Sequence, residues 1–338
     1  MSEPLLKIDH VSKRFTRDLG LIQRGLARLT GGRGVETVHA LTDVNLSVQR
    51  GEVLGIVGES GCGKSTLGRI ASGIYAATEG SVTLDGQPVA QERGGRTQKL
   101  TTKVQMIHQD PFASLNPRMK VGETIGEGPR LNHLAKAPEV RARTRELLEQ
   151  VGLEATYVDR YPHQFSGGQR QRIAIARALA MNPEVLVLDE AVASLDVSIQ
   201  AQVLNVFTDL RRDLGLTALF ISHDLSVVRH VCDRVAIMYL GRVVELADAS
   251  VLYDKPLHPY TEALFASVPT LGTGRARFNP IKGEIPSPLN PPSGCAFHPR
   301  CPLAGPRCRA EVPRLRGTTV GRDVACHLHD GGTGVEAA

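Results

Sequence analysis

The segment Gly58-Glu-Ser-Gly-Cys-Gly-Lys-Ser-Thr66 constrains the fold of this chain more than any other part of its sequence. It matches the pattern G-x-x-x-x-G-K-[ST], follows the apolar run Glu52–Val57 and precedes a stretch that favours a helix from about Ser65. Glycines let successive backbone N–H groups surround a phosphate, and a helix N-terminus adds a favourable dipole. This order of strand, loop and helix therefore predicts an α/β fold that binds a nucleotide.

All residues of this phosphate loop are candidates for nucleotide binding: Gly58, Glu59, Ser60, Gly61, Cys62, Gly63, Lys64, Ser65 and Thr66. Lys64 can neutralise β- and γ-phosphate oxygens of ATP, and the Ser65 hydroxyl can bind Mg²⁺. The alternative is a glycine-rich turn with an incidental lysine, and the flanking strand and helix argue against it.

Two adjacent acids end a second apolar run, Val185-Leu-Val-Leu-Asp-Glu190. Ligands of open α/β sheets bind beyond the carboxyl ends of the strands, so both acids are expected near the phosphate loop. Asp189 would hold Mg²⁺, and Glu190 would act on the attacking water as general base. Acidic pairs at strand ends are common as solvated turns, so this interpretation depends on the phosphate loop.

The rest of the chain also alternates between strand and helix patterns. We expect further strands at 41–48, 218–221 and 234–238, and helices at 141–151 and 169–181. Such alternation indicates a mostly parallel central sheet. Apolar runs reach only strand length and the first residues lack the layout of a signal peptide, so we expect a cytoplasmic protein whose membrane contacts come through partners.

The turn Ser166-Gly-Gly-Gln169 directly precedes one of these helices and offers a second set of anion-binding N–H groups. With this turn the chain resembles the ABC ATPase family, whose signature motif it is; an ordinary helix cap is the alternative. In that family the signature of one subunit closes on the nucleotide held by the phosphate loop of another. The resemblance thus implies two ATP molecules sandwiched in a dimer, with Ser166, Gly167, Gly168 and Gln169 serving the partner's site.

Other elements of this family occur in the expected order. The resemblance implies that Gln109 contacts Mg²⁺ and relays closure to membrane subunits, and that His223 is the switch histidine against the γ-phosphate. It places Asp196 in the loop that crosses the dimer interface. Phe15 is the candidate for stacking on adenine, with a core phenylalanine as an equal alternative.

Three phrases resemble the peptide and nickel importer branch of the family: Gln109-Asp-Pro-Phe-Ala-Ser-Leu-Asn-Pro117, Tyr161-Pro-His-Gln-Phe165 and Leu257-His-Pro-Tyr-Thr261. Gln169 and the insert after Phe15 resemble the second, F-type, of that branch's two ATPase subunits. The implied partners are a second homologous ATPase, two permease subunits and, indirectly, an extracytoplasmic peptide-binding protein, with the chain peripheral at the cytoplasmic face of the membrane. His108 departs from the phenylalanine usual there.

The insert between Phe15 and His39 carries apolar residues at helical spacing, among them Leu19, Ile22 and Leu26. It is either a short basic amphipathic helix near the membrane or a solvated loop.

The sequence is expected to divide into an ABC nucleotide-binding domain at 1–249, with a helical subdomain at about 110–178, and a small irregular C-terminal extension at 250–338. The extension is rich in proline and holds four cysteines: Cys295, Cys301, Cys308 and Cys326. Their spacing differs from the paired C-x-x-C of common zinc sites, and thiolates on an irregular segment can wrap a cluster. The family resemblance favours a [4Fe–4S] cluster, with structural zinc or no metal as alternatives. Far from the ATP site in sequence, the cluster is expected to be structural or redox-sensing.

The leading hypothesis is therefore an ATP hydrolase that powers import of di- and oligopeptides. Import of nickel or another small solute is the alternative within transport. A soluble ABC protein acting on nucleic acid would carry tandem cassettes or a coiled coil, and this chain has one cassette and no sustained heptads, so we expect no nucleic-acid partner. Intact Lys64, Asp189, Glu190 and His223 argue against an inactive cassette.

Overall fold

The computed structural model describes residues 3–18, 35–134, 136–267, 281, 283–318 and 322–330. Among these residues the largest sheet has eight strands in the order β13-β14-β12-β11-β3-β10-β9-β8. The strands are β3 (Val53–Val57), β8 (Val104–Ile107), β9 (Val185–Asp189), β10 (Thr217–Ile221), β11 (Arg234–Tyr239), β12 (Arg242–Asp248), β13 (Arg316–Gly317) and β14 (Asp323–Val324).

The centre of this main sheet is parallel, as its apolar runs predict. Strand β10 pairs in parallel with both β3 and β9, and β8 and β11 flank them in the same direction. All residues of β3, β9 and β10 are buried, because helices or the second sheet cover both faces. Strand β12 then pairs antiparallel with β11 at one edge.

A second, antiparallel sheet with the order β2-β1-β4-β5 packs beside the main sheet. Its strands are β1 (Leu6–Asp18), β2 (Val35–Val48), β4 (Glu79–Leu84) and β5 (Gln87–Pro88), and β6 (Ala90–Arg93) pairs with β7 (Arg96–Lys99) nearby. Leu6, Ile8 and Val11 bury one face of β1 against the core that β3 and β10 share. Strand β2 begins earlier than the predicted strand at 41–48, and it pairs with β1 out to Asp18↔Val35. The predicted amphipathic helix of the insert lies largely at 19–34, outside the described residues.

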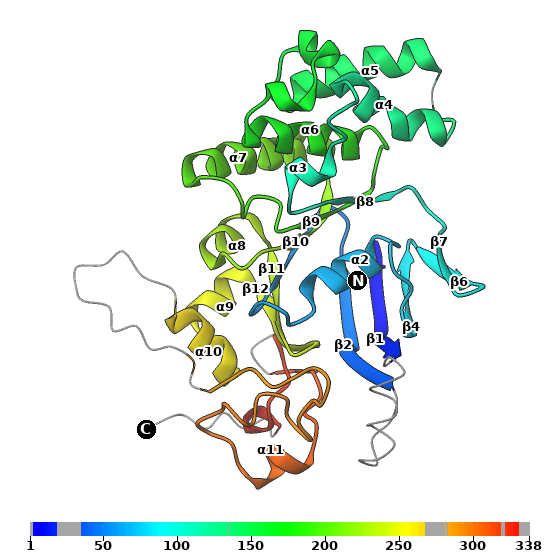
Figure 1. The fold of residues 1–338 in the computed structure, drawn as a ribbon. Helices are drawn as coiled ribbons and strands as arrows, with labels where there is room; N and C mark the ends of the chain where they lie inside the picture. Colours follow the sequence, from blue (N-terminus) through cyan, green and yellow to red (C-terminus); the bar gives the residue numbers. More distant parts are fainter. Residues whose placement is uncertain are drawn as a thin grey trace, which may run out of the picture.

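Most helices lie at one end of the molecule or beside the main sheet, and α11 lies at the other end (Figure 1). They are α2 (Lys64–Ala71), α3 (Pro111–Ser114), α4 (Val121–Leu131), α5 (Ala137–Gln150), α6 (Gly167–Leu179), α7 (Val197–Leu214), α8 (Leu225–Val231), α9 (Ala249–Asp254), α10 (Pro259–Ala266) and α11 (Pro306–Ala310), with 3₁₀ turns at Ala155–Asp159, Pro162–Gln164 and His327–His329. Helices α4, α5 and α6 pack together as a helical subdomain, and Ile125, Leu147 and Ile173 are buried in the core. No helix of the described residues has the length and apolar character needed to cross a bilayer.

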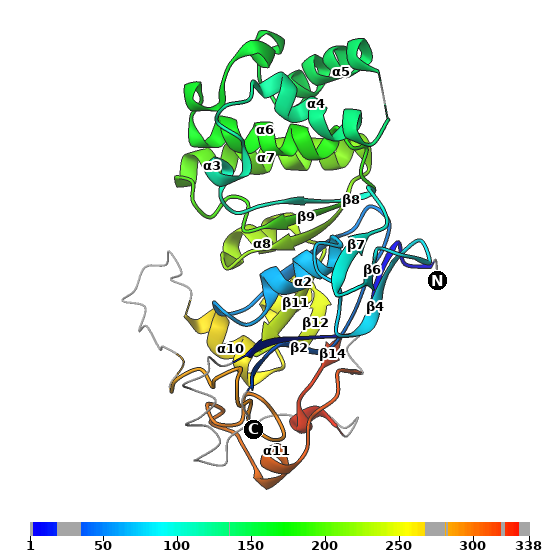
Figure 2. The same cartoon turned by 45° about the vertical axis from the view of Figure 1, so that its right-hand side comes forward.

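The C-terminal extension lies at the opposite end from this helical subdomain in both views (Figures 1 and 2). It joins the main sheet directly, because β14 pairs antiparallel with β12 at Glu245↔Val324. The fully buried Glu245 carboxylate accepts hydrogen bonds from the backbone N–H groups of Leu257 and His258 and lies 3.7 Å from the Arg322 guanidinium. A buried carboxylate thus ties two parts of the extension to the edge of the sheet.

Replacing Glu245 with alanine should lower the free energy of unfolding by about 3–5 kcal/mol, because it leaves the buried Arg322 charge without its partner. Chemical denaturation and limited proteolysis of the extension would measure the effect. The matched control is Glu79→Ala, which breaks an exposed pair with Arg14 and should cost less than about 1 kcal/mol. Equal stability of the two variants would contradict the anchoring role of Glu245.

Candidate functional site

The phosphate loop connects β3 to α2 and packs tightly against neighbouring backbone. A Cβ at Gly58 would lie 2.2 Å from the Met238 carbonyl oxygen, and one at Gly63 would lie 2.5 Å from that of Ala40. Gly63 also has a φ of 106°, in the left-handed region that favours glycine. Glycine at these two positions therefore lets the loop pack closely against β11 and β2.

Lys64 lies inside this curl. Its buried ammonium donates to the carbonyl oxygens of Gly58 at 2.8 Å and Glu59 at 3.1 Å. The charge is thus held where the loop's N–H groups would surround a phosphate, and it can move from these carbonyls to β- and γ-phosphate oxygens.

The two residues expected to bind Mg²⁺ from this side lie in contact. The Ser65 hydroxyl donates to Asp189 Oδ1 at 2.8 Å. Burial raises the pKa of the Asp189 carboxyl, and the Ser65 hydrogen bond opposes that rise. Hydroxyl and carboxylate oxygens are ligands that Mg²⁺ prefers, so the pair fits that ion.

Three candidate catalytic residues meet at one carboxylate oxygen. Gln109 Nε2 donates to Glu190 Oε2 at 3.2 Å, and His223 Nδ1 lies 3.3 Å from the same oxygen. Glu190 has a φ of 49°, rarely populated by residues other than glycine, and its N–H donates to the Ile221 carbonyl. Backbone strain of this kind is typical of functional sites. Beside Gln109, burial and then the Arg177 charge lower the pKa of His108, so this side chain is neutral at physiological pH.

The signature turn caps α6 through its own side chains. Gln169 N–H donates to the Ser166 hydroxyl and Ser166 N–H donates to Gln169 Oε1, which is a capping box. A Cβ on Gly168 would lie 2.3 Å from Ile199 Cγ2, so glycine lets the turn approach α7, whose N-cap is Asp196. The turn therefore packs directly against the start of α7, which follows the expected dimer loop. Helix α6 belongs to the helical layer, whereas α2 lies against the main sheet (Figure 2).

Phe15 lies on β1 with 38% of its surface exposed. Its ring meets Tyr75 edge to face, with 5.7 Å between centroids, and the Lys13 ammonium lies 5.2 Å from the ring centroid. The ring is thus accessible for stacking on a base and is not part of the hydrophobic core.

The sequence did not indicate two residues of the C-terminal extension that touch the phosphate loop. Glu59 N–H donates to the Tyr260 hydroxyl at 3.0 Å, and the Arg300 guanidinium donates to both oxygens of the Glu59 carboxylate. Tyr260 lies in the Leu257–Thr261 phrase that resembled the importer branch, and nothing in the sequence marked Arg300. Both the side chain and the backbone N–H of Glu59 are thus engaged by the extension.

The four cysteines of the extension line one small cavity together with His258 and His327. All four are free thiols, and burial raises the pKa of Cys326 to about 12. In the part of the chain that the structure describes, no group of three or more His, Cys, Asp or Glu side chains is arranged to hold a metal ion. The structure thus gathers the thiols without forming a shell for a single ion.

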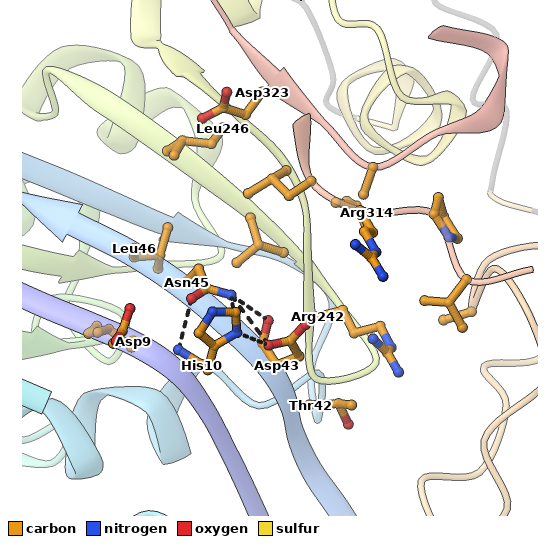
Figure 3. Close-up of a pocket in the computed structure, with 18 of the residues that line it drawn as sticks. Asp9, His10, Thr42, Asp43, Asn45, Leu46, Arg242, Leu246, Arg314 and Asp323 are labelled. Atoms are coloured by element: carbon orange, nitrogen blue, oxygen red, sulfur yellow. Dashed lines mark hydrogen bonds and ion pairs between the residues drawn. The ribbon is translucent and has the colours of Figure 1, made fainter. Parts of the chain in front are cut away.

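A larger cavity of about 840 Å³ lies between β1, β2, β12 and residues 312–315 (Figure 3). His10 Nδ1 lies 2.6 Å from Asp43 Oδ1, and Asn45 completes a polar cluster on its wall. Its lining includes neither the phosphate loop nor Glu190. The groups suited to phosphate chemistry therefore lie outside this cavity.

Comparison with known families and proteins agrees with this geometry. Residues 41–193 match the family described as ABC transporter, and residues 244–308 match the oligopeptide/dipeptide transporter C-terminal region. The chain is 48% identical over 331 residues to the oligopeptide transport ATP-binding protein AppF of Bacillus subtilis, covering 97% of this chain and 98% of that protein. It is 48% identical over 307 residues to the di/tripeptide transport ATP-binding protein DppF of Pseudomonas aeruginosa, covering 90% and 93%.

Solved structures share the fold. The cbiO1 subunit of the ABC transporter complex cbiONQ from Clostridium perfringens superposes with a TM-score of 0.60 at 28% identity, covering 75% of this chain and 92% of that one. A dimeric ATP-binding cassette in a post-hydrolysis state, bound to ADP and Pi, gives a TM-score of 0.59 at 28% identity, covering 72% and 98%.

Replacing Glu190 with glutamine should lower ATP turnover about a hundredfold or more, because the amide cannot take a proton from water. ATP binding should persist and a closed, ATP-bound dimer should accumulate. Steady-state hydrolysis and equilibrium ATP binding by the purified complex are the measurements. Glu184→Gln, at a half-buried residue just before the same strand, should retain near-normal turnover. Near-normal hydrolysis by Glu190→Gln would remove Glu190 from the role of base.

Proposed function

The chain belongs to the family of ABC transporter ATP-binding proteins, and we propose that it hydrolyses ATP to drive the import of di- and oligopeptides. The observation that carries the ATPase function is the meeting of Gln109 and His223 at the Glu190 carboxylate, beside the Ser65–Asp189 pair. The peptide substrate is supported by the match to the oligopeptide/dipeptide transporter C-terminal region and by relatives named for oligopeptide and di/tripeptide transport.

Each side chain has a distinct task in hydrolysis. The loop N–H groups and Lys64 would hold the β- and γ-phosphates. Ser65 and Asp189 would hold Mg²⁺, which when bound would neutralise charge on the phosphates. Glu190 orients the attacking water and accepts its proton, while His223 stabilises charge on the γ-phosphate. Gln109 would transmit changes at this site to the helical layer. Its side chain contacts Glu190, and its backbone begins the segment that leads to α3.

The proposed assembly places this chain at the cytoplasmic face of the membrane. A second homologous ATPase would supply the signature turn over this chain's nucleotide, and Ser166–Gln169 would in turn cover the partner's nucleotide. Two permease subunits would dock near residues 109–121, and an extracytoplasmic binding protein would deliver the peptide. The exposed Ser166 of the signature turn, the exposed Asp196 and the similarity to a dimeric cassette support the paired arrangement.

The complete transporter in proteoliposomes should accumulate a labelled tripeptide only when ATP and the binding protein are supplied, and the peptide should stimulate hydrolysis. Lys64→Ala should lower ATP-driven uptake about tenfold or more, since this charge holds the transferred phosphate. The exposed Lys103→Ala is the matched control and should retain uptake. Transport of nickel or another small solute, with no response to any peptide, would overturn the proposed substrate.

We propose further that Cys295, Cys301, Cys308 and Cys326 hold a [4Fe–4S] cluster, with structural zinc as the alternative metal. The four free thiols that line one cavity support this proposal. A cluster binds its four thiolates on different irons, so these ligands can lie farther apart than the ligands of a single tetrahedral ion. When bound, such a cluster would crosslink a segment with little regular structure. Its charge would favour thiolates that burial otherwise keeps protonated.

Protein purified without oxygen should be brown, with broad absorption at about 400 nm and about four irons per chain. Replacing any one of the four cysteines with serine should remove the colour and expose the extension to proteases, while ATP binding at Lys64 largely survives. Cys232→Ser, at a buried cysteine elsewhere in the chain, should leave the iron content unchanged. Stoichiometric zinc without iron, or four freely alkylated thiols, would contradict the cluster.

A further inference from the structure

An arginine of the cysteine segment (residues 295–308) forms an ion pair with the phosphate loop. Arg300 Nη1 donates to Glu59 Oε2 at 2.7 Å and Nη2 donates to Glu59 Oε1 at 3.1 Å. Only 4% of the Arg300 side chain is exposed. Paired bonds of this kind between a guanidinium and a carboxylate fix direction as well as distance, and burial strengthens them.

The backbone of the same loop residue is held as well. The Glu59 N–H donates to the Tyr260 hydroxyl, and the Glu59 carbonyl accepts from the Lys64 ammonium. Glu59 is therefore fixed at its side chain and N–H by the extension and at its carbonyl by the lysine that serves the phosphates. A displacement of Glu59 would displace Lys64 and the neighbouring N–H groups together.

A packed aromatic cluster joins these contacts to the cavity of the four thiols. The buried rings of Tyr239, Tyr260 and Phe297 lie with centroids 4.7, 5.3 and 5.4 Å apart. Arg300 adds a contact, since its guanidinium lies 5.8 Å from the centre of the Tyr239 ring. Phe297 also lines the thiol cavity. Continuous side-chain packing thus runs from the cysteines to the loop.

We propose that Arg300 is a positioning residue for the phosphate loop, through which the order of the cysteine segment sets the affinity of this chain for ATP. The proposal rests on the proposed ATP-binding function. The loop binds phosphate through N–H groups that must already point in the right directions before ATP arrives. The contact between Glu59 and Arg300 of the extension holds the loop in that conformation. By thermodynamic linkage, ATP binding must then stabilise the cysteine segment by the same factor.

The first test measures ATP affinity and hydrolysis in the complete transporter. Arg300→Ala should raise the Kd and KM for ATP about tenfold, with kcat at saturating ATP changed less than about threefold. Arg300→Lys should recover part of the affinity, because lysine keeps the charge without the paired geometry. Arg307→Ala, which removes an exposed arginine of the same segment, should leave the affinity unchanged.

A double-mutant cycle separates the pair from general destabilisation. Glu59→Gln should weaken ATP binding, and adding Arg300→Ala to it should produce little further loss, since the two changes remove one interaction. A purely structural role for Arg300 would instead lower the folded fraction and leave the KM of the folded complex unchanged. Unchanged ATP affinity in folded Arg300→Ala and Glu59→Gln complexes would overturn the proposal.

The reciprocal effect of ATP on the cysteine segment can be measured in fully folded protein. In the unmodified complex, ATP with Mg²⁺ should slow hydrogen exchange of residues 295–308, and in Arg300→Lys this protection should shrink. No ATP-dependent protection in the unmodified complex would also overturn the proposal. Both readouts concern ATP binding, so a transporter that binds ATP normally but imports no peptide would contradict the proposed function and leave this inference standing.

Discussion

The parallel pairing of β3, β10 and β9 brings the candidate catalytic side chains of this chain together. Because the three strands run in one direction, their carboxyl ends meet at one edge of the sheet, where the phosphate loop, His223 and the Asp189–Glu190 pair follow directly. The strands can lie in the centre of the sheet because almost all of their residues are apolar. The polar Asp189, at the end of β9, accepts a hydrogen bond from the Ser65 hydroxyl. The close approach of Gly58 to the Met238 carbonyl then fixes the loop against the adjacent β11.

The C-terminal extension is part of the structure around the ATP site. Strand β14 lengthens the main sheet, Glu245 anchors the chain near residue 257, and Arg300 with Tyr260 contacts Glu59 of the phosphate loop. The cysteine cavity is therefore connected by packed side chains to the loop, although more than two hundred residues separate Glu59 from Arg300 in sequence. The cysteines can therefore have a structural or redox role and, through these contacts, also influence nucleotide binding.

Local patterns predicted most of the parallel sheet and the composition of the candidate site, because apolar runs and loop motifs carry their signal within a few residues. Several elements escaped this reasoning, among them helix α7 and strand β12. Helix α7 buries only Val203, Phe207 and Leu210, and β12 follows β11 after a turn too short to mark a boundary. The Arg300–Glu59 pair could not be predicted at all, since an arginine in an irregular segment gives no sign of a partner so distant in sequence.

In the proposed assembly this chain holds one half of each of two sites: a phosphate loop with its candidate catalytic carboxylate, and a signature turn whose Ser166 and Gln169 cap their own helix. Hydrolysis should therefore require a second ATPase. The most direct measurement is the specific ATPase activity at low protein concentration of the chain alone and of the chain mixed with its partner ATPase and permeases. The account predicts low activity for the isolated chain and a marked increase in the complex. Equal specific activity in the two samples would contradict it.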